Sequence, residues 1–168
     1  MIFRYCPDCG NVLVPKVIGD EGEVPFCDQC SRPFFPLPSP CVICLCIDEN
    51  DDILLIKQSY GKRRFVCVAG YIKPGESAED ACKREISEET GLAVSSVCYL
   101  YSRYFDRNDN LMLAFVCRVG RAELTLSQEV SEAEWFTADD AYSALFEGAY
   151  GRTMIEKWRE LRNGGAPV

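Results

Sequence analysis

The chain has 168 residues, which is enough for one globular domain with a sizeable core and little more. Charged residues make up 26% and hydrophobic residues 48%, a balance typical of a soluble globular protein and not of a disordered or fibrous one. No stretch approaches the ~20 apolar residues that a membrane helix needs. The first residues also lack the apolar segment of a signal peptide, so we expect a cytoplasmic protein without a membrane partner.

The charge balance is acidic. Lys and Arg number 18 against 26 Asp and Glu, a net charge of −8, and the sequence pI is about 4.7. Broad contact with a nucleic-acid backbone needs clustered positive charge, so this balance argues against a nucleic-acid partner. It fits a protein that binds cations, or one that binds an anionic ligand through a metal.

The chain contains no histidine. This absence excludes Ser-His and Cys-His nucleophile pairs, histidine-ligated catalytic zinc and histidine general bases. Any catalysis must therefore use carboxylates, Lys, Tyr, Cys, or a metal that is held by oxygen and sulfur.

The N-terminal segment, residues 1–38, is predicted to be a small zinc ribbon. Seven of the nine prolines lie in residues 1–40, and so short a segment buries too little apolar surface to fold without a staple. Two Cys-x-x-Cys pairs supply four thiolates: Cys6, Cys9, Cys27 and Cys30. This spacing predicts a closed, structural Zn²⁺ site with no open coordination position. Two disulfides, or four unrelated thiols, are the alternative interpretation.

The other seven cysteines lie among apolar neighbours. They are Cys41, Cys44, Cys46, Cys67, Cys82, Cys98 and Cys117. Buried thiols behave as small hydrophobic side chains, and we interpret all seven in this way. Cys41 and Cys44 resemble a redox pair in spacing, but successive side chains of a strand alternate between its two faces, which argues against that role.

Residues 39–163 are predicted to form the main domain. In chain order, the apolar runs and turn signals predict strands over 41–48, 53–58, 65–68, 94–104, 111–119 and 134–136. Helices are predicted over 77–90, 137–147 and 152–162. This order of elements indicates a mixed sheet with helices packed on it. Residues 164–168 are expected to be a flexible tail.

The helix predicted over 77–90 has clear ends. Ser77, with Asp80 three residues later, forms an N-terminal capping pattern, and Gly91 follows as a C-terminal stop. Between these ends, apolar residues recur at helical spacing and define an inward face.

Three glutamates lie on or beside that inward face. With a step of about 100° per residue, Glu85 and Glu89 fall in the middle of the apolar arc, and Glu88 falls at its edge. A glutamate run is usually a solvated face, which is the alternative interpretation. Carboxylates that crowd on an inward face repel one another and lose hydration, and a hard divalent cation compensates both effects. The spacing therefore favours a Mg²⁺ or Mn²⁺ site.

The segment before this helix is a loop, residues 70–75, that contains two glycines and a proline. It brings backbone N–H groups close to the N-terminus of the helix, where phosphate oxygens bind favourably. Taken alone, such a loop is a weak signal.

The segment from Gly70 to Leu92 resembles the conserved box of the Nudix family. Its box reads Gly-x5-Glu-x7-Arg-Glu-U-x-Glu-Glu-x-Gly-U, where U is apolar. The nine matching residues are Gly70, Glu76, Arg84, Glu85, Ile86, Glu88, Glu89, Gly91 and Leu92. The resemblance implies the Nudix fold, an α/β/α sandwich with a mixed sheet. It also implies hydrolysis of a nucleoside diphosphate that is linked to another group.

The resemblance implies roles for individual residues. Glu85, Glu88 and Glu89 would hold Mg²⁺ or Mn²⁺ and serve in catalysis, and Arg84 would orient these carboxylates. Glu76 would be supportive. Ala69 and one glutamate after the box are the further candidate metal ligands. Among Glu129, Glu132 and Glu134, we choose Glu129 for that position.

The order of a four-cysteine ribbon and a Nudix domain resembles the NADH pyrophosphatase subfamily, which is usually homodimeric. That subfamily carries Ser-Gln-Pro-Trp-Pro-Phe-Pro-x-Ser as its mark of NADH specificity, whereas Ser102–Asn110 here keep only the leading serine. NADH specificity is therefore not implied. The candidate substrate-binding residues are Gly70, Tyr71, Arg103, Tyr104 and Phe105. A plain hairpin with solvated charges is the alternative for the last three.

We therefore predict a metal-dependent nucleotide pyrophosphatase that acts on a small-molecule nucleotide such as NADH, NAD or ADP-ribose and releases a mononucleotide. The alternative is a non-catalytic nucleotide-binding or partner-binding adaptor on the same ribbon and Nudix scaffold. A ribbon directed at nucleic acid, or an RNA-decapping enzyme, is disfavoured by the acidic charge balance.

Overall fold

A computed structural model describes residues 3–165. The chain forms two compact units, Met1–Ser39 and Pro40–Val168, and each is described by itself. The predicted flexible tail falls largely on residues 166–168, which lie outside the described residues. No helix of the described residues is both long enough and apolar enough to cross a membrane.

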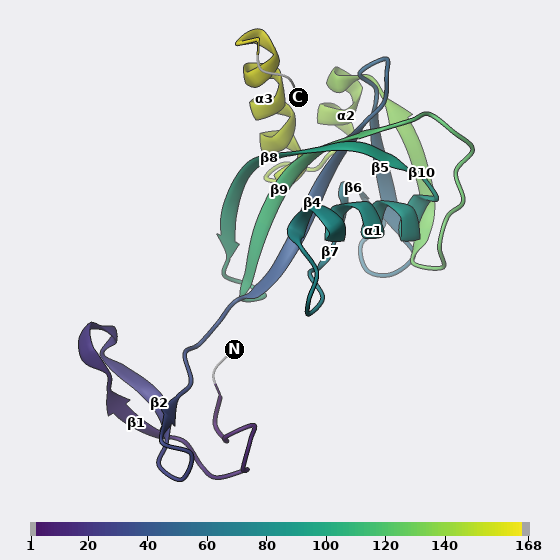
Figure 1. Cartoon of the computed structure of the whole chain (residues 1–168). Helices are drawn as coiled ribbons and strands as arrows, with labels where there is room; N and C mark the ends of the chain where they lie inside the picture. Colours follow the sequence, from purple (N-terminus) through teal and green to yellow (C-terminus); the bar gives the residue numbers. More distant parts are fainter. Residues whose placement is uncertain (1–2, 166–168) are drawn as a thin grey trace. The chain divides into compact units, whose positions relative to one another are not determined.

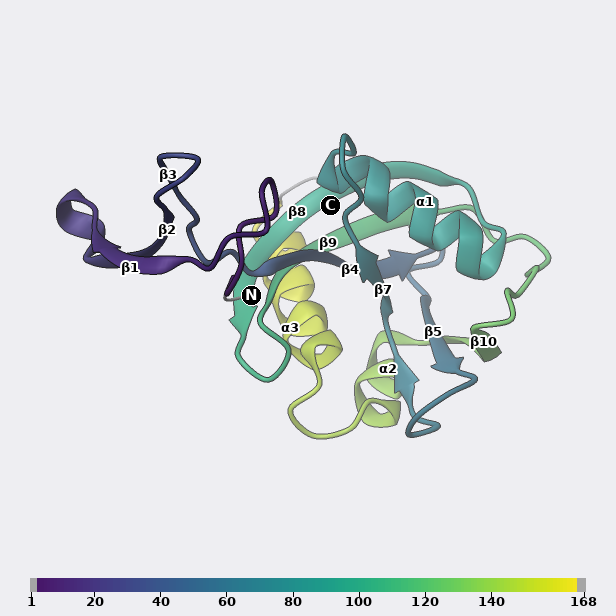
Figure 2. The ribbon, with the colours of Figure 1, turned by 90° about the horizontal axis from the view of Figure 1, so that it is seen from below.

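The first unit is a small antiparallel sheet in the order β1-β2-β3; β1 and β2 are labelled in Figure 1, and all three strands in Figure 2. Its strands are β1 (Val14–Val17), β2 (Glu23–Cys27) and β3 (Arg32–Pro33), with a short 3₁₀ helix at Gly19–Glu21. The sequence did not predict these strands, because their prolines obscure any alternating pattern. The buried apolar core of this unit is small. It consists of Phe34 and two of the ribbon cysteines, Cys6 and Cys27.

The second unit is built on a seven-stranded sheet in the order β10-β5-β4-β9-β8, with β6 paired to β5 and β7 paired to β4. Its strands are β4 (Ser39–Ile47), β5 (Ile53–Gln58), β6 (Phe65–Val66), β7 (Val68–Tyr71), β8 (Val94–Phe105), β9 (Asn110–Val119) and β10 (Val130–Phe136). Its helices are α1 (Ala78–Thr90), α2 (Ala138–Ala144) and α3 (Tyr150–Asn163).

The helices cover both faces of this sheet: α1 lies on one side and α2 and α3 on the other (Figure 2). The central strand β4 shows the reason. Its residues Val42, Cys44 and Cys46 pack in the core beneath α1. The alternate residues Ile43, Leu45 and Ile47 pack against α2 and α3. Because β4 is buried on both faces, its sequence is a continuous apolar run and not an alternating one. The predicted α/β/α sandwich is confirmed.

The caps of α1 form as predicted. The Ser77 hydroxyl accepts a hydrogen bond from the Asp80 backbone N–H at 3.1 Å. Gly91 ends the helix with φ of 76°, in the left-handed region that favours glycine. Other boundaries differ from the prediction. The run 65–68 divides into β6 and β7, α2 ends at Ala144, and β10 begins four residues earlier than expected.

The cysteines of the second unit are buried, apart from the half-buried Cys98. Burial raises the pKa of Cys67 to about 12, so this thiol stays protonated and apolar, as predicted. The sulfur atoms of three of them meet in the core beneath α1, all within 4.8 Å of one another: Cys44, Cys82 and Cys117. Sequence spacing does not predict this cluster, because its members come from β4, α1 and β9.

Candidate active site

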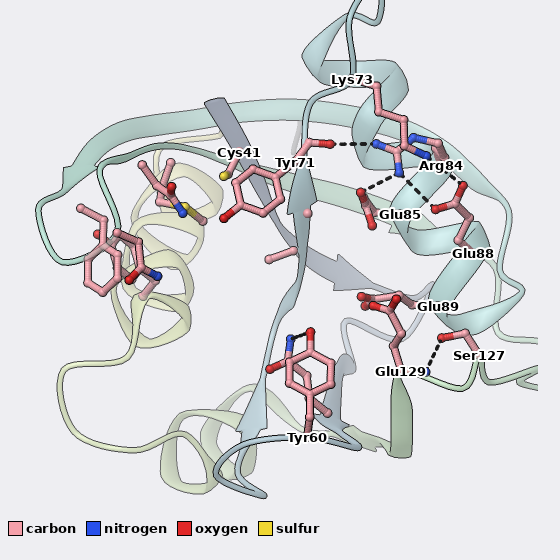
Figure 3. Close-up of a pocket in the computed structure, with 18 residues that line it drawn as sticks. Cys41, Tyr60, Tyr71, Lys73, Arg84, Glu85, Glu88, Glu89, Ser127 and Glu129 are labelled. Carbon is pink, nitrogen blue, oxygen red and sulfur yellow. Dashed lines mark hydrogen bonds and ion pairs between the residues drawn. The ribbon is translucent and has the colours of Figure 1, made fainter. Parts of the chain in front are cut away.

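A pocket of about 840 Å³ opens beside α1 and β7. Glu85, Glu88 and Glu89 reach it from α1, and Glu129 reaches it from the segment before β10 (Figure 3). Four carboxylates from two separate parts of the chain therefore share one cavity.

Gly70, in β7, allows α1 to lie this close to the sheet. A Cβ atom at this position would overlap the Glu85 carboxylate. Any other residue at this position would require the Glu85 carboxylate to move from the place that it occupies here. Glycine at the first position of the box thus leaves the Glu85 carboxylate in place beside β7.

Arg84 organises the carboxylates around it (Figure 3). Its Nε and Nη2 donate to the two oxygens of Glu76 at 2.7 and 2.9 Å. Its Nη1 donates to Glu85 Oε1 at 2.6 Å and to Glu88 Oε2 at 3.1 Å. Its Nη2 also donates to the backbone carbonyl of Tyr71 at 3.0 Å. The planar guanidinium thus holds three carboxylates and β7 at once, a geometry that lysine cannot reproduce.

Glu76 is a supporting group and not a pocket residue. The Arg84 side chain and the Lys73 backbone N–H, which donates to Glu76 Oε2 at 3.0 Å, lower the pKa of Glu76 to about 2. A carboxylate that stays ionised in this way anchors the arginine permanently. This placement agrees with the supportive role that the resemblance implies.

Glu89 has the opposite environment. The residue is 6% exposed, and its Oε2 atom is buried without a hydrogen-bond partner. Burial, and then the negative charges of Glu85, Glu129 and Glu88, raise the pKa of Glu89 from 4.5 to about 7. A buried carboxylate oxygen that no donor satisfies is costly, and a bound cation removes that cost. The donor set of this pocket therefore fits a divalent metal ion.

The two other predicted metal ligands lie in the pocket, and the two glutamates that were not chosen lie elsewhere. Ala69 and Glu129 line the same pocket as the α1 glutamates. Glu132, a rejected candidate, pairs instead with Lys57 at 2.7 Å. The other rejected candidate, Glu134, lies opposite Leu55 in the register of β10 and β5.

The predicted substrate residues also divide. Gly70, Tyr71 and Phe105 line the pocket, whereas Arg103 and Tyr104 are not part of its wall. The Tyr104 hydroxyl donates to Asp109 at 2.8 Å. The Arg103 guanidinium lies over the ring of Tyr150, in α3.

Sequence reasoning missed several pocket residues, namely Tyr60, Asn108, Asn110, Met112 and Tyr150. None of them belongs to the box or has a distinctive spacing. The one available signal was the altered segment Ser102–Asn110, which contains two of them.

The ribbon cysteines also converge. The thiol sulfurs of Cys6, Cys9, Cys27 and Cys30 all lie within 4.8 Å of one another. Hydrogen bonding with the Cys9 thiol, burial and the other two thiols raise the pKa of Cys30 to about 12. Four sulfur atoms this close together match the tetrahedral donor set of a thiolate metal site, so the cluster fits a metal.

Comparison with known proteins agrees with this geometry. A family model described as NUDIX domain matches residues 37–157. The chain is 34% identical to Nudix hydrolase 19, chloroplastic, of Arabidopsis thaliana, over 97% of this chain and 40% of that protein. It is 30% identical to the NAD-capped RNA hydrolase NudC of Photobacterium profundum, over 91% of this chain and 57% of that protein. The chain thus spans about half the length of these curated relatives.

Solved structures share the fold. A NUDIX hydrolase from Nitrosomonas europaea superposes with a TM-score of 0.78 at 19% identity, over 99% of this chain and 96% of that one. The NUDIX domain of Shewanella oneidensis NrtR, complexed with ADP ribose, superposes with a TM-score of 0.64 at 17% identity, over 80% of this chain and 92% of that one. The matched family model covers most of the chain, including the α1 glutamates and the pocket around them, and the protein therefore belongs to the Nudix family.

Proposed function

We propose that the protein hydrolyses the diphosphate linkage of a nucleoside diphosphate joined to another group and releases a mononucleotide, with Mg²⁺ or Mn²⁺ as cofactor. One observation carries this proposal: Glu89, whose Oε2 is buried without a hydrogen-bond partner, lines a pocket together with three more carboxylates.

The proposed metal ligands are Glu85, Glu88, Glu89, Glu129 and the backbone carbonyl of Ala69. A bound divalent cation would neutralise charge on the diphosphate, which is the main requirement of phosphoryl transfer to water.

The chain's own residues have defined tasks in this proposal. Arg84 fixes the orientation of Glu85 and Glu88 through its hydrogen bonds to both. A glutamate of the set accepts the proton of the attacking water, since the chain contains no histidine.

We also propose that the four ribbon cysteines hold a structural Zn²⁺. Four thiolates close the tetrahedral coordination that zinc prefers and leave no position for a substrate. In this proposal residues 1–38 form the ribbon and residues 39–163 the catalytic domain. The expected homodimer stays a prediction, to be measured by light scattering of the purified chain.

The names of similar proteins guide the choice of substrates. One relative is named an NAD-capped RNA hydrolase, and one neighbour is complexed with ADP ribose. The acidic charge of this chain argued against nucleic acid, but the name of that relative makes NAD-capped RNA a substrate to be tested. NADH, NAD and ADP-ribose are the small-molecule candidates.

The test is a cleavage assay on this panel, with Mg²⁺, with Mn²⁺ and without a divalent metal. We expect metal-dependent release of a mononucleotide by the wild type and its loss in Glu89→Gln. Glu79→Gln is the matched control, because Glu79 lies on the exposed face of the same helix. Full activity of Glu89→Gln would refute the assignment of this site.

The binding-module alternative makes a different prediction. A neighbour whose NUDIX domain is complexed with ADP ribose shows that this fold can hold such a ligand. Tight binding of a panel member without any metal-dependent cleavage would favour the adaptor over the enzyme.

A further inference from the structure

The far part of the same pocket is built by different elements from the carboxylates. Phe105 ends β8 and Asn110 begins β9, and the two residues face each other across the hairpin. Tyr150, the first residue of α3, places its ring 5.7 Å from that of Phe105 at an angle of 81°. The Arg103 guanidinium lies 5.5 Å from the centre of the Tyr150 ring. This region therefore has aromatic walls.

Asn110 is the polar group of this region. The residue is 7% exposed, and its Oδ1 atom is buried without a hydrogen-bond partner. A buried carbonyl oxygen without a hydrogen bond needs an explanation, because the missing hydrogen bond lowers the stability of the folded protein. Asn110 also lines the pocket, so a ligand can supply the missing donor.

The position of Asn110 on β9 explains its burial. Side chains of a strand alternate, so Asn110 shares a face with Met112 and Ala114. Both of these residues pack in the core on the side of α2 and α3. An apolar residue would satisfy that environment at no cost, which makes the amide at this position notable.

We propose that Asn110 recognises the adenine base of the substrate, with the exocyclic amine donating to Oδ1 and the ring of the base lying against Phe105 and Tyr150. The inference rests on the proposed function, since it names the base of that substrate. A side-chain amide complements the adjacent donor and acceptor of adenine. Aromatic side chains provide the flat surface on which a base stacks.

The proposal makes Asn110 a specificity-determining residue. Hypoxanthine carries a carbonyl oxygen where adenine carries the amine, so an acceptor would face the Oδ1 acceptor. A site with a buried polar partner strongly rejects a ligand that cannot complete the hydrogen bond. AMP and IMP therefore form a ligand pair that differs at the tested atom.

The experiment is calorimetric titration of the full chain with AMP and with IMP, which requires no turnover. We expect the wild type to bind AMP about 10-fold or more tightly than IMP. Asn110→Leu removes the acceptor, and the two affinities should become equal. Asn110→Asp retains an acceptor and should retain the preference for AMP. Asp106→Asn, a change in the same hairpin at an exposed side chain that does not line the pocket, is the matched control and should keep the wild-type ratio.

The outcomes separate the possibilities. Equal affinity of the wild type for AMP and IMP overturns the inference, and this test needs no variant to fold. A loss of affinity in Asn110→Leu that is the same for both nucleotides shows a structural role and also overturns it. Collapse of the ratio in the Asp106→Asn control, with the ratio intact in Asn110→Leu, overturns it as well.

The same data separate this inference from the proposed function. A preference for AMP that depends on Asn110, in a protein that cleaves nothing, supports the base site and refutes hydrolysis. Cleavage of the panel without discrimination between AMP and IMP refutes only the role of Asn110. Failure of both nucleotides to bind, in a protein that cleaves the panel, also refutes that role.

Discussion

The replacement of Glu89 by Gln removes a buried charge with almost no change in volume. In the metal-free protein, burial and the charges of Glu85, Glu129 and Glu88 raise the pKa of Glu89 from 4.5 to about 7. The folded chain therefore binds this proton more tightly than the unfolded chain does. The stability that it contributes is present below pH 4.5 and is lost as the pH rises towards 7.

The magnitude follows from these two pKa values. At 1.36 kcal/mol for each tenfold change in the acid constant, the interval from 4.5 to about 7 corresponds to about 3.4 kcal/mol. Solvent in the pocket screens part of this effect, so we expect a stabilisation of about 2 kcal/mol by Glu89→Gln at pH 8. For a chain of this size, this change raises Tm by about 4–8 °C.

The assay is thermal unfolding in magnesium-free buffer without a chelator, so that the zinc proposed for the ribbon is not removed. Glu89→Gln should melt above the wild type at pH 8 and together with it at pH 4.5. Added Mg²⁺ should stabilise the wild type more than the variant, because the ion binds only the folded carboxylate site. Glu79→Gln should behave as the wild type throughout. If Glu89→Gln melts at or below the wild type at pH 8, the reasoning about this carboxylate is wrong.

Three further predictions follow from the same contacts. Gly70→Ala places a methyl group in the space of the Glu85 carboxylate. We expect this change to lower kcat by about 100-fold, because it displaces a catalytic carboxylate. A kcat within twofold of the wild type would contradict the close approach of Gly70 and Glu85. Cys6→Ser should reduce zinc, measured by atomic emission, from one to well below one per chain, whereas Cys98→Ser should not; unchanged zinc in the first variant argues against a four-thiolate site. Ser77→Ala removes the helix cap and should cost about 1 kcal/mol, seen as a lower Tm, with activity per folded molecule unchanged; an equal Tm would show that the cap contributes nothing.

Much of this protein was determined by local sequence. The ends of α1 depend on Ser77 and Gly91, and a cap needs only residues within one turn of the helix. The inward position of Glu85 and Glu89 follows from the helical period alone. Four cysteines in two close pairs likewise predict their own cluster. The helix features could be predicted because the interacting residues are neighbours in the chain. The cysteine cluster could be predicted because two Cys-x-x-Cys pairs have the ligand spacing of a metal site.

Only the tertiary structure decided which distant residues complete the pocket. Glu129 reaches Glu89 because β10 pairs with β5, and the Ser59 backbone N–H donates to the Glu129 carbonyl at 2.8 Å. Asn110 and Tyr150 line the same pocket because α3 packs on the face of the sheet that Asn110 shares. No periodicity encodes either meeting, since each depends on strand register and helix packing between segments that are far apart in the chain.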